Sequence, residues 1–337
     1  GLSLASASAA LDVTATAAFD GLSGKLGLTS GALGWDGARV QGLAGGGDFT
    51  LRAGDVTARY RLEGRGLASS ALGAERMLVE GMVRSRDRFA RLESEGTLEG
   101  HAVAPGKGLD TALGGLVESG KGTLLAPLAA QFRQGLAREA PGSRLAASYT
   151  LRQGGQLATL VIPSAVLTGR SGADLLRLTR TEVMLGGRTG PRLWGNVVTG
   201  GPGIPSIEGR IERQGAGRAT ARLRMAEYRA GDARLALPEL VLVQESGGAI
   251  GFSGRAELSG PLPGGRIDSL VVPIDGIWSQ GAGLAAWRRC TPLRFAAFKV
   301  ASLQLDRREL TVCPGREGAI LRSDARGLRI AGGTAGF

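Results

Sequence analysis

The segment DFTLRAGDVTARYRLEGRG, residues 48–66, alternates apolar and charged side chains over much of its length. Ala58, Tyr60 and Leu62 occupy every second position, and the positions between them carry arginine or glutamate. A period of two places these three side chains on one face of a strand and the charges on the other, which is the pattern of a strand with one solvated face. This segment therefore predicts an antiparallel sheet with an apolar face and a polar face.

The same alternating pattern covers most of the chain. It recurs between glycines from Leu2 to about Gly100, as in GKLGLTSGALGW and RFARLESEGTLEG, and it returns after Ser143 in segments such as SRLAASYTLRQ and GRATARLRMAEYRAG. The chain has 57 glycines in 337 residues, more than twice the average usage of about 7%. No fixed period of a repeat protein is present. We expect a mainly β protein built as a long, irregular antiparallel meander.

One segment departs from the strand pattern. In LDTALGGLVESGKGTLLAPLAAQFRQGLAREA, residues 109–140, Leu128, Phe132 and Leu136 recur every four residues, Pro127 suits a first helical turn, and a Pro-Gly pair follows. A shorter helix opened by Asp110 is weakened by two glycines. We therefore predict a β meander over residues 1–108, a helical insertion over residues 109–142, and a second β meander over residues 143–337.

The charge balance excludes little by itself. The formal net charge is +11, and only four of the basic residues are lysines. The positive charge is spread along the chain, and its densest run, RSRDRFAR at residues 84–91, is interrupted by Asp87. A nucleic-acid module concentrates its basic residues and adds stacking aromatics or a reader motif. Because the chain has neither, we expect no nucleic-acid partner.

Catalytic, cofactor and metal motifs are missing from the sequence. The single histidine, His101, cannot complete a Cys/His zinc set, and no G-x-S-x-G elbow accompanies it. GLVESGKGT at residues 115–123 resembles a phosphate loop, but Gly122 stands where the magnesium-binding hydroxyl belongs and no apolar strand precedes it. We expect no catalytic residue, no metal and no cofactor, and hence a protein that is not an enzyme.

The two cysteines, Cys290 and Cys313, lie in the stretch of residues 287–318. Within SLQLDRRELTV the alternation predicts a hairpin that turns at Arg307–Arg308, with Leu305 opposite Leu310. A disulfide would close a loop of about two dozen residues and stabilise the fold by about 3 kcal/mol. Two separate buried thiols in a reducing compartment are the alternative. We favour the disulfide, and with it an oxidising, periplasm-like location.

The chain contains no run of eighteen apolar residues and no visible signal peptide. It also begins in the middle of an alternating pattern, without a methionine. We therefore expect a segment of a longer protein, with its targeting and membrane-anchoring parts elsewhere.

The stretch W-x-x-C-T-P-L-x-F followed by L-x-L-x-x-x-x-L-T-V-C-P, within a long glycine-punctuated β meander, resembles the YdbH-type proteins of the AsmA-like, TamB-related superfamily of Gram-negative envelopes. The resemblance implies an elongated, curled, taco-like sheet that forms a groove. It further implies a non-enzymatic segment of a periplasm-spanning bridge, anchored in the inner membrane outside this segment, that carries phospholipid towards the outer membrane. It names no protein partner.

An apolar groove would solvate phospholipid acyl chains, at about 0.8 kcal/mol per buried methylene. Many small side chains would keep it open, and arginines at its rims could meet phosphates. The groove candidates are Ala58, Tyr60, Leu62, Leu303, Leu305, Leu310 and Val312. Alternation alone fits a filled core equally well. The alternative function is a structural or adhesin-like periplasmic or surface domain without a lipid groove.

Overall fold

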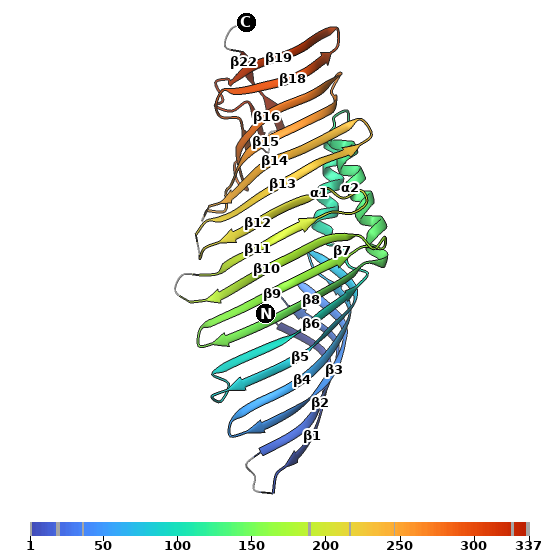
Figure 1. The fold of residues 1–337 in the computed structure, drawn as a ribbon, viewed down its shortest axis with the longest axis vertical. Coiled ribbons are helices and arrows are strands. Elements are labelled where there is room, and N and C mark those ends of the chain that lie inside the picture. The colour runs from blue at the N-terminus through green and yellow to red at the C-terminus, as the bar shows by residue number, and fades with distance from the viewer. Residues whose placement is uncertain are drawn as a thin grey trace. The chain divides into compact units, whose positions relative to one another are not determined.

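The computed structural model describes residues 2–17, 21–35, 37–187, 190–215, 217–245, 247–324 and 327–334. Within these ranges the chain forms 22 strands of one antiparallel sheet, two α-helices and a short 3-10 helix (Figure 1). The mainly β, antiparallel class and the helical insertion are thus confirmed. The described strand pairings do not close the sheet on itself.

The chain divides into two compact units. Unit 1 comprises Gly1–Ala112, Gln134–Asn196 and Gly200–Pro202, and unit 2 comprises Leu113–Arg133, Val197–Thr199 and Gly203–Phe337. The boundaries predicted at residues 108 and 142 lie where the chain changes from strands to helices and back to strands. That they are domain boundaries stays a prediction.

Unit 1 contains the strands that precede and directly follow the helical insertion. They are β1 (Leu2–Ala15), β2 (Gly21–Trp35), β3 (Ala38–Arg52), β4 (Asp55–Ala68), β5 (Leu72–Arg86), β6 (Arg91–His101), β7 (Ala104–Pro105), β8 (Arg144–Gly154), β9 (Leu157–Thr168) and β10 (Asp174–Gly186). Each long strand pairs with its neighbour in the chain, except that β6 pairs with β8 from His101 opposite Arg144 onward. The sheet therefore continues across the insertion as if the helices were absent.

The insertion itself consists of α1 (Lys107–Ser119), α2 (Leu125–Glu139) and the 3-10 helix Ala140–Gly142. Asp110 lies in the first turn of α1, where the negative charge of a carboxylate interacts favourably with the helix dipole. The helix continues through Gly114 and Gly115, the two glycines that weakened its prediction. The residues of the near phosphate-loop match lie in α1 and in the turn after it, so a helix rather than a strand runs into Gly115. The phosphate-loop geometry is therefore not formed.

Buried polar contacts fix the end of the insertion within unit 1. The Ser143 hydroxyl accepts a hydrogen bond from the Val103 amide at 2.7 Å, and Ser143 is 1% exposed. The Glu139 carboxylate, also buried, accepts hydrogen bonds from the amide and the hydroxyl of Ser171, both at 2.9 Å. The bond from the Ser171 amide, opposed by burial, lowers the pKa of Glu139. These bonds hold the chain where it returns from helix to strand.

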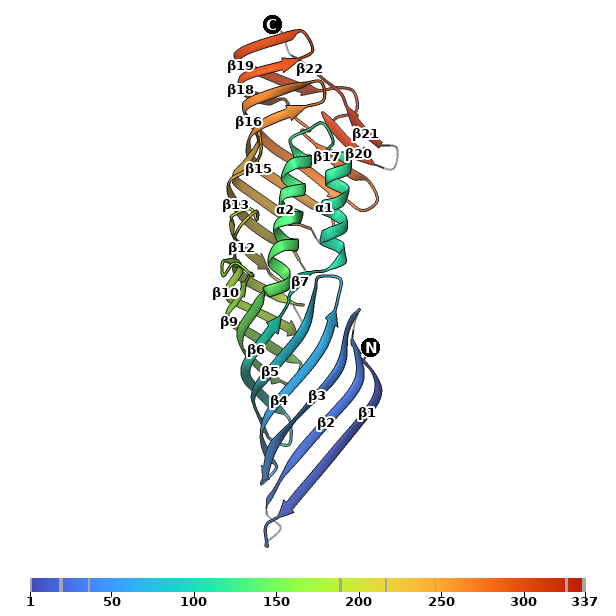
Figure 2. The same ribbon diagram turned by 90° about the vertical axis from the view of Figure 1, so that its right-hand side faces the viewer.

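Unit 2 contains the later strands of the meander. They are β12 (Ile207–Arg213), β13 (Ala219–Ala230), β14 (Ala233–Gln244), β15 (Ile250–Leu262), β16 (Gly265–Ser279), β17 (Gly283–Ala286), β18 (Thr291–Val300), β19 (Leu303–Pro314), β20 (Leu321–Asp324), β21 (Gly327–Ile330) and β22 (Gly332–Thr334), while β11 (Arg192–Thr199) has residues in both units. Figure 2 shows the helices beside β13–β15. Leu124 and Leu128 pack there against Ala230 and Ala233, all at most 5% exposed.

The strand order of unit 2 forks at β16. Residues Gly276–Ser279 of β16 pair with β17, whereas residues Gly265–Val271 pair with β18. One branch continues from β17 through β20 to β21, and the other continues from β18 through β19 to β22 (Figure 2). The middle of β16 therefore lacks a strand partner on this side.

Trp287 satisfies the backbone that the fork leaves unpaired. Its amide donates to the Asp275 carbonyl at 2.9 Å, and its indole Nε1 donates to the Pro273 carbonyl at 2.7 Å. The Trp287 carbonyl in turn accepts from the amide of Ile320. Trp287 has φ of 55°, a value that is uncommon for a bulky residue. The tryptophan of the sequence motif thus ties the segment between β17 and β18 to β16 and to the residue that precedes β20.

The Cys290–Cys313 disulfide is confirmed. Thr291 lies opposite Val312 in the β18–β19 register, so the next position in that register brings Cys290 opposite Cys313. The bond ties the end of β19 to the segment that leaves the fork.

The hairpin turn predicted at Arg307–Arg308 is wrong. β19 is continuous through both arginines, and the chain turns instead at Ala301, with Leu305 opposite Phe298 and Leu310 opposite Leu293. A two-residue turn needs positive φ at positions where arginine is disfavoured. The register with β18 offers both ends of β19 apolar partners, so the longer hairpin is formed.

Replacing both cysteines by serine is expected to lower the free energy of unfolding by about 3 kcal/mol, because a disulfide with a sequence separation of 23 restricts the unfolded chain. Chemical denaturation of the oxidised protein and of the double variant measures the difference. A midpoint unchanged by the substitution would contradict a stabilising role for the bond.

Candidate lipid-binding faces

The apolar face of unit 1 is organised in rows that run across the strands. One row crosses nine strands from β1 to β10 and contains no polar side chain: Ala9, Leu28, Gly45, Leu62, Val79, Leu98, Ala147, Ala165 and Leu178. At about 4.8 Å between strands, this row extends for roughly 40 Å. Its leucines are half-buried rather than fully buried. All described strands of the unit belong to one sheet.

A second apolar row runs beside the first. It contains Val13, Gly24, Phe49, Ala58, Val83, Ser94, Leu151, Leu160 and Val183. The register thus places the sequence candidates Ala58 and Leu62 on one continuous face with residues from eight other strands. Tyr60 lies between them on the same face.

The opposite face of unit 1 is ionic. Cross-strand carboxylate–guanidinium pairs join neighbouring strands, with Arg84 3.9 Å from Glu95 and Arg152 3.0 Å from Glu93. Arg61 also pairs with Glu80. Each such exposed pair contributes little to stability. Together, however, these charged side chains keep this face of the sheet solvated. The sheet therefore separates an apolar side from a charged side.

The row between the two apolar rows contains two adjacent glycines, Gly81 and Gly96, with a tyrosine on each side of them. Tyr60 on β4 and Tyr149 on β8 extend toward each other over Gly81 and Gly96, and their hydroxyls are hydrogen-bonded. The Tyr60 hydroxyl also lies 3.0 Å from the Ser94 hydroxyl. A Cβ atom at Gly81 would stand 2.7 Å from the Tyr60 hydroxyl. The rings therefore occupy space that side chains on β5 and β6 would otherwise fill.

Partial burial raises the pKa of Tyr149 to about 12, and its hydrogen bond with Tyr60 acts in the same direction. The three hydroxyls form a polar island within an apolar face. The sequence singled out Tyr60 but missed Tyr149 and Ser94. The signal is the adjacent pair Gly81 and Gly96, which becomes visible only once the strands are in register.

The apolar face of unit 2 follows the same construction. One row crosses six strands with Ile211, Ala221, Leu242, Phe252, Gly276 and Ala286. Farther along, Phe295 and Phe298 stack with ring centroids 5.9 Å apart. Of the remaining sequence candidates, Leu305, Leu310 and Val312 are half-buried, and Leu303 is 52% exposed. Their role as lipid contacts stays a prediction.

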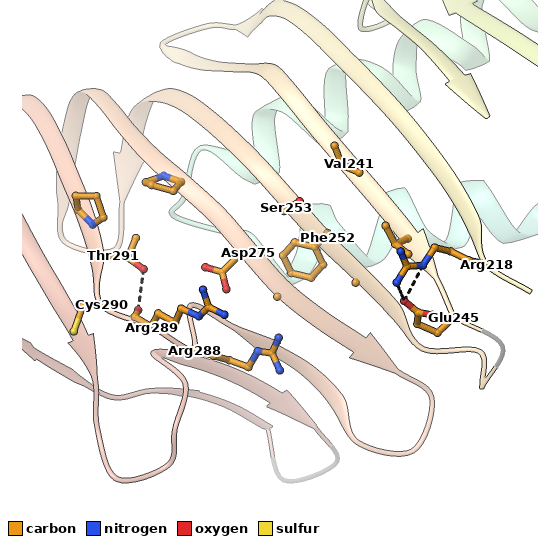
Figure 3. Close-up of a pocket in the computed structure, with 15 residues that line it drawn as sticks. Arg218, Val241, Glu245, Phe252, Ser253, Asp275, Arg288, Arg289, Cys290 and Thr291 are labelled. Carbon is orange, nitrogen blue, oxygen red and sulfur yellow. Dashed lines mark hydrogen bonds and ion pairs between the residues drawn. The ribbon is translucent and has the colours of Figure 1, made fainter. Parts of the chain in front are cut away.

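A cavity of about 730 Å³ lies beside the fork in unit 2 (Figure 3). Val241, Ser253 and Asp275 are successive cross-strand partners along its wall, one position out of step with the apolar row. Arg288 and Arg289, which follow the tryptophan of the fork, complete the lining together with Cys290. Most of the lining side chains therefore come from the ionic side of the sheet, while Phe252 and Gly276 of the apolar row also border the cavity.

Within the described residues, no group of three or more histidine, cysteine, aspartate or glutamate side chains could hold a metal ion. No helix in the described ranges has the length and apolar content needed to cross a membrane.

A family model described as YdbH-like, intermembrane phospholipid transport protein YdbH, matches residues 1–329. The chain belongs to the YdbH-like family. Comparison with curated proteins gave no match. The resemblance carried by the cysteine-containing stretch is therefore confirmed over nearly the whole chain. The family is one of lipid transport proteins rather than of enzymes, and its intermembrane function places the chain in the cell envelope.

The close packing at Gly81 predicts that even a small side chain at this position lowers the stability of the fold. Gly81→Ala is expected to lower the free energy of unfolding by about 1–3 kcal/mol, because the new methyl group meets the Glu95 carbonyl and the Tyr60 hydroxyl. Gly115→Ala is the control: this helical glycine has no atom within 4 Å of the added Cβ. The control is expected to raise stability by up to about 1 kcal/mol. Equal effects in denaturant titrations would contradict the packing argument.

The tyrosine pair predicts a loss of stability at high pH. The pKa of Tyr149 is about 12 in the folded protein and near 10 in the unfolded chain. Below pH 10 both states are protonated, so the contribution of Tyr149 is constant; between pH 10 and pH 12 only the unfolded state ionises, and stability falls. Unfolding measured across this window should show a shallower decline in Tyr149→Phe. An identical slope in the variant would refute the assignment.

Proposed function

We propose that the apolar faces of unit 1 and unit 2 are acyl-chain paths, and that the protein is a non-enzymatic segment of a periplasmic bridge that conducts phospholipid between the inner and outer membranes. The observation that supports this proposal is the row from Ala9 to Leu178, which is apolar at every one of nine positions and whose leucines are only half-buried. A filled core would bury these side chains under a second layer.

The energetics of the rows favour a lipid occupant. Each methylene that leaves water for an apolar surface gains about 0.8 kcal/mol, so an acyl chain laid along the row replaces the missing second layer. Alanine, valine and glycine outnumber bulky aromatic residues in the rows, so few large side chains project from the apolar face. The row runs from strand to strand, so a chain can move along it without crossing a polar side chain.

The candidates Leu303, Leu305, Leu310 and Val312 extend this proposal to β19 in unit 2, as Ala58, Tyr60 and Leu62 carry it in unit 1. The curled, taco-like groove belongs to the same proposal. We also place the chain in the periplasm of a Gram-negative bacterium, as part of an inner-membrane-anchored envelope protein. The family's intermembrane transport function and the disulfide, which suits an oxidising compartment, support this location.

Phospholipid that co-purifies with the protein tests the path. Leu98→Asp puts a carboxylate into the middle of the apolar row, where an acyl chain would have to desolvate it, and we expect a several-fold drop in bound phospholipid per protein by extraction and mass spectrometry. Thr97→Asp introduces the same charge at the adjacent, exposed position on the ionic face. This control should retain its lipid.

Circular dichroism of both variants establishes that the sheet is intact. Wild-type protein without bound phospholipid, or an equal loss of lipid in the two variants, would overturn the lipid path and favour a purely structural domain.

A further inference from the structure

We propose that the cavity beside the fork of unit 2 is a binding site for a phosphate ester with an apolar substituent, in which Arg288 and Arg289 bind the anion. Its wall residues Val241, Ser253 and Asp275 come from the ionic side of the sheet, and Phe252 and Gly276 of the apolar row border the same cavity. A cavity of about 730 Å³ falls in the range of ligand pockets.

The charges around the cavity favour an anion. Arg218 is neutralised by Glu245, whose carboxylate accepts from its Nη2 at 2.7 Å and from its Nε at 3.1 Å. In the part of the chain that the structure describes, no ion pair joins Arg288 or Arg289 to a carboxylate. Asp275 is the remaining acid of the lining, and one carboxylate cannot neutralise two guanidinium groups. An excess positive charge therefore remains in the cavity.

The chemistry of the two arginines matches phosphate. A guanidinium presents paired N–H donors in a fixed fork, which bind phosphate oxygens in a bidentate manner and more strongly than neutral donors do. Figure 3 shows the guanidinium of Arg289 beside Asp275, with the Arg288 side chain extending next to it along the same side of the cavity. The Ser253 side chain supplies a hydroxyl donor in the same lining.

The segment that carries the arginines is fixed at both ends. Trp287 is hydrogen-bonded to β16 through its amide and its indole, and Cys290 is covalently tied to Cys313. Between them, the Thr291 hydroxyl donates to the Arg289 carbonyl at 3.1 Å. A backbone held in this way reduces the entropy that binding would otherwise cost. The disulfide thus acquires a role in positioning the site.

The remaining walls determine which phosphate fits. Val241, Val243, Pro273 and Pro292 line the cavity with apolar surface. Inorganic phosphate would leave that surface in contact with water, whereas the glycerol backbone and first methylenes of a glycerophospholipid would cover it. We therefore assign the headgroup region of a phospholipid as the ligand class.

Binding of soluble, short-chain dihexanoyl phosphatidylglycerol, measured by calorimetry on the intact chain, tests the assignment. Arg288→Gln combined with Arg289→Gln should raise the dissociation constant at least tenfold, because charge-assisted hydrogen bonds contribute about 1.5–3 kcal/mol each and 1.4 kcal/mol is a factor of ten. The control is Arg307→Gln combined with Arg308→Gln, which removes the same charge from an exposed pair on β19. The control should bind as wild type does.

Binding of inorganic phosphate is measured in the same way as a second probe. Inorganic phosphate should bind more weakly than the short-chain lipid, and equal affinities would overturn the ester assignment. Absence of binding by either probe, or equal weakening in the two double variants, would overturn the site.

Long-chain phospholipid that co-purifies should be unaffected by the Arg288 and Arg289 substitutions. Conversely, Leu98→Asp should keep its affinity for the short-chain lipid. Failure of the acyl-chain path and failure of the phosphate-ester site are therefore separable. Because Arg288 and Arg289 are exposed, their replacement by glutamine is expected to leave the fold intact, which circular dichroism checks.

Discussion

Cross-strand register is the constraint on which the structure depends. A slip of one residue between two neighbouring strands would turn every apolar side chain of one strand to the ionic face. Nine strands of unit 1 keep their registers, through several bulges, so that Ala9 at one end and Leu178 at the other end belong to the same apolar row. Apolar continuity is thus a property of the whole set of strands, and no single residue creates it.

Glycine supports this register in a way that composition alone does not reveal. Gly47, Tyr60, Gly81, Gly96 and Tyr149 lie in one cross-strand row, and the two tyrosine rings cover Gly81 and Gly96, which lie between them. A larger residue at the row would displace the rings, while a polar one would break the apolar face. High glycine content therefore serves close packing on one face of the sheet as well as its turns, and the Tyr60–Tyr149 contact fastens strands that are not neighbours.

Sequence reasoning succeeded where the signal was local. The alternation around Tyr60 predicted the strand and its faces, and the four-residue spacing around Phe132 predicted the second helix, because each signal lies within one element. The hairpin prediction at Arg307–Arg308 failed, because the apolar positions are arranged symmetrically about these two arginines and therefore suggest a turn. The true partner of β19 is β18, and that pairing extends over ten residues outside the segment. The fork could not be predicted from the sequence either, because Trp287 contacts Pro273 and Asp275 only through tertiary hydrogen bonds.

The fork explains why the most distinctive stretch of the chain combines an aromatic residue, two arginines and a cysteine. A sheet that splits leaves carbonyl groups of β16 without a strand partner, and unpaired buried backbone is costly. Trp287 supplies the missing donors, and the Cys290–Cys313 bond holds the segment that follows. Once both ends are held, the backbone of Arg288 and Arg289 has little freedom, and both residues line the cavity beside the fork. The hydrogen bonds and the disulfide that close the fork thus also position two cationic residues beside the cavity.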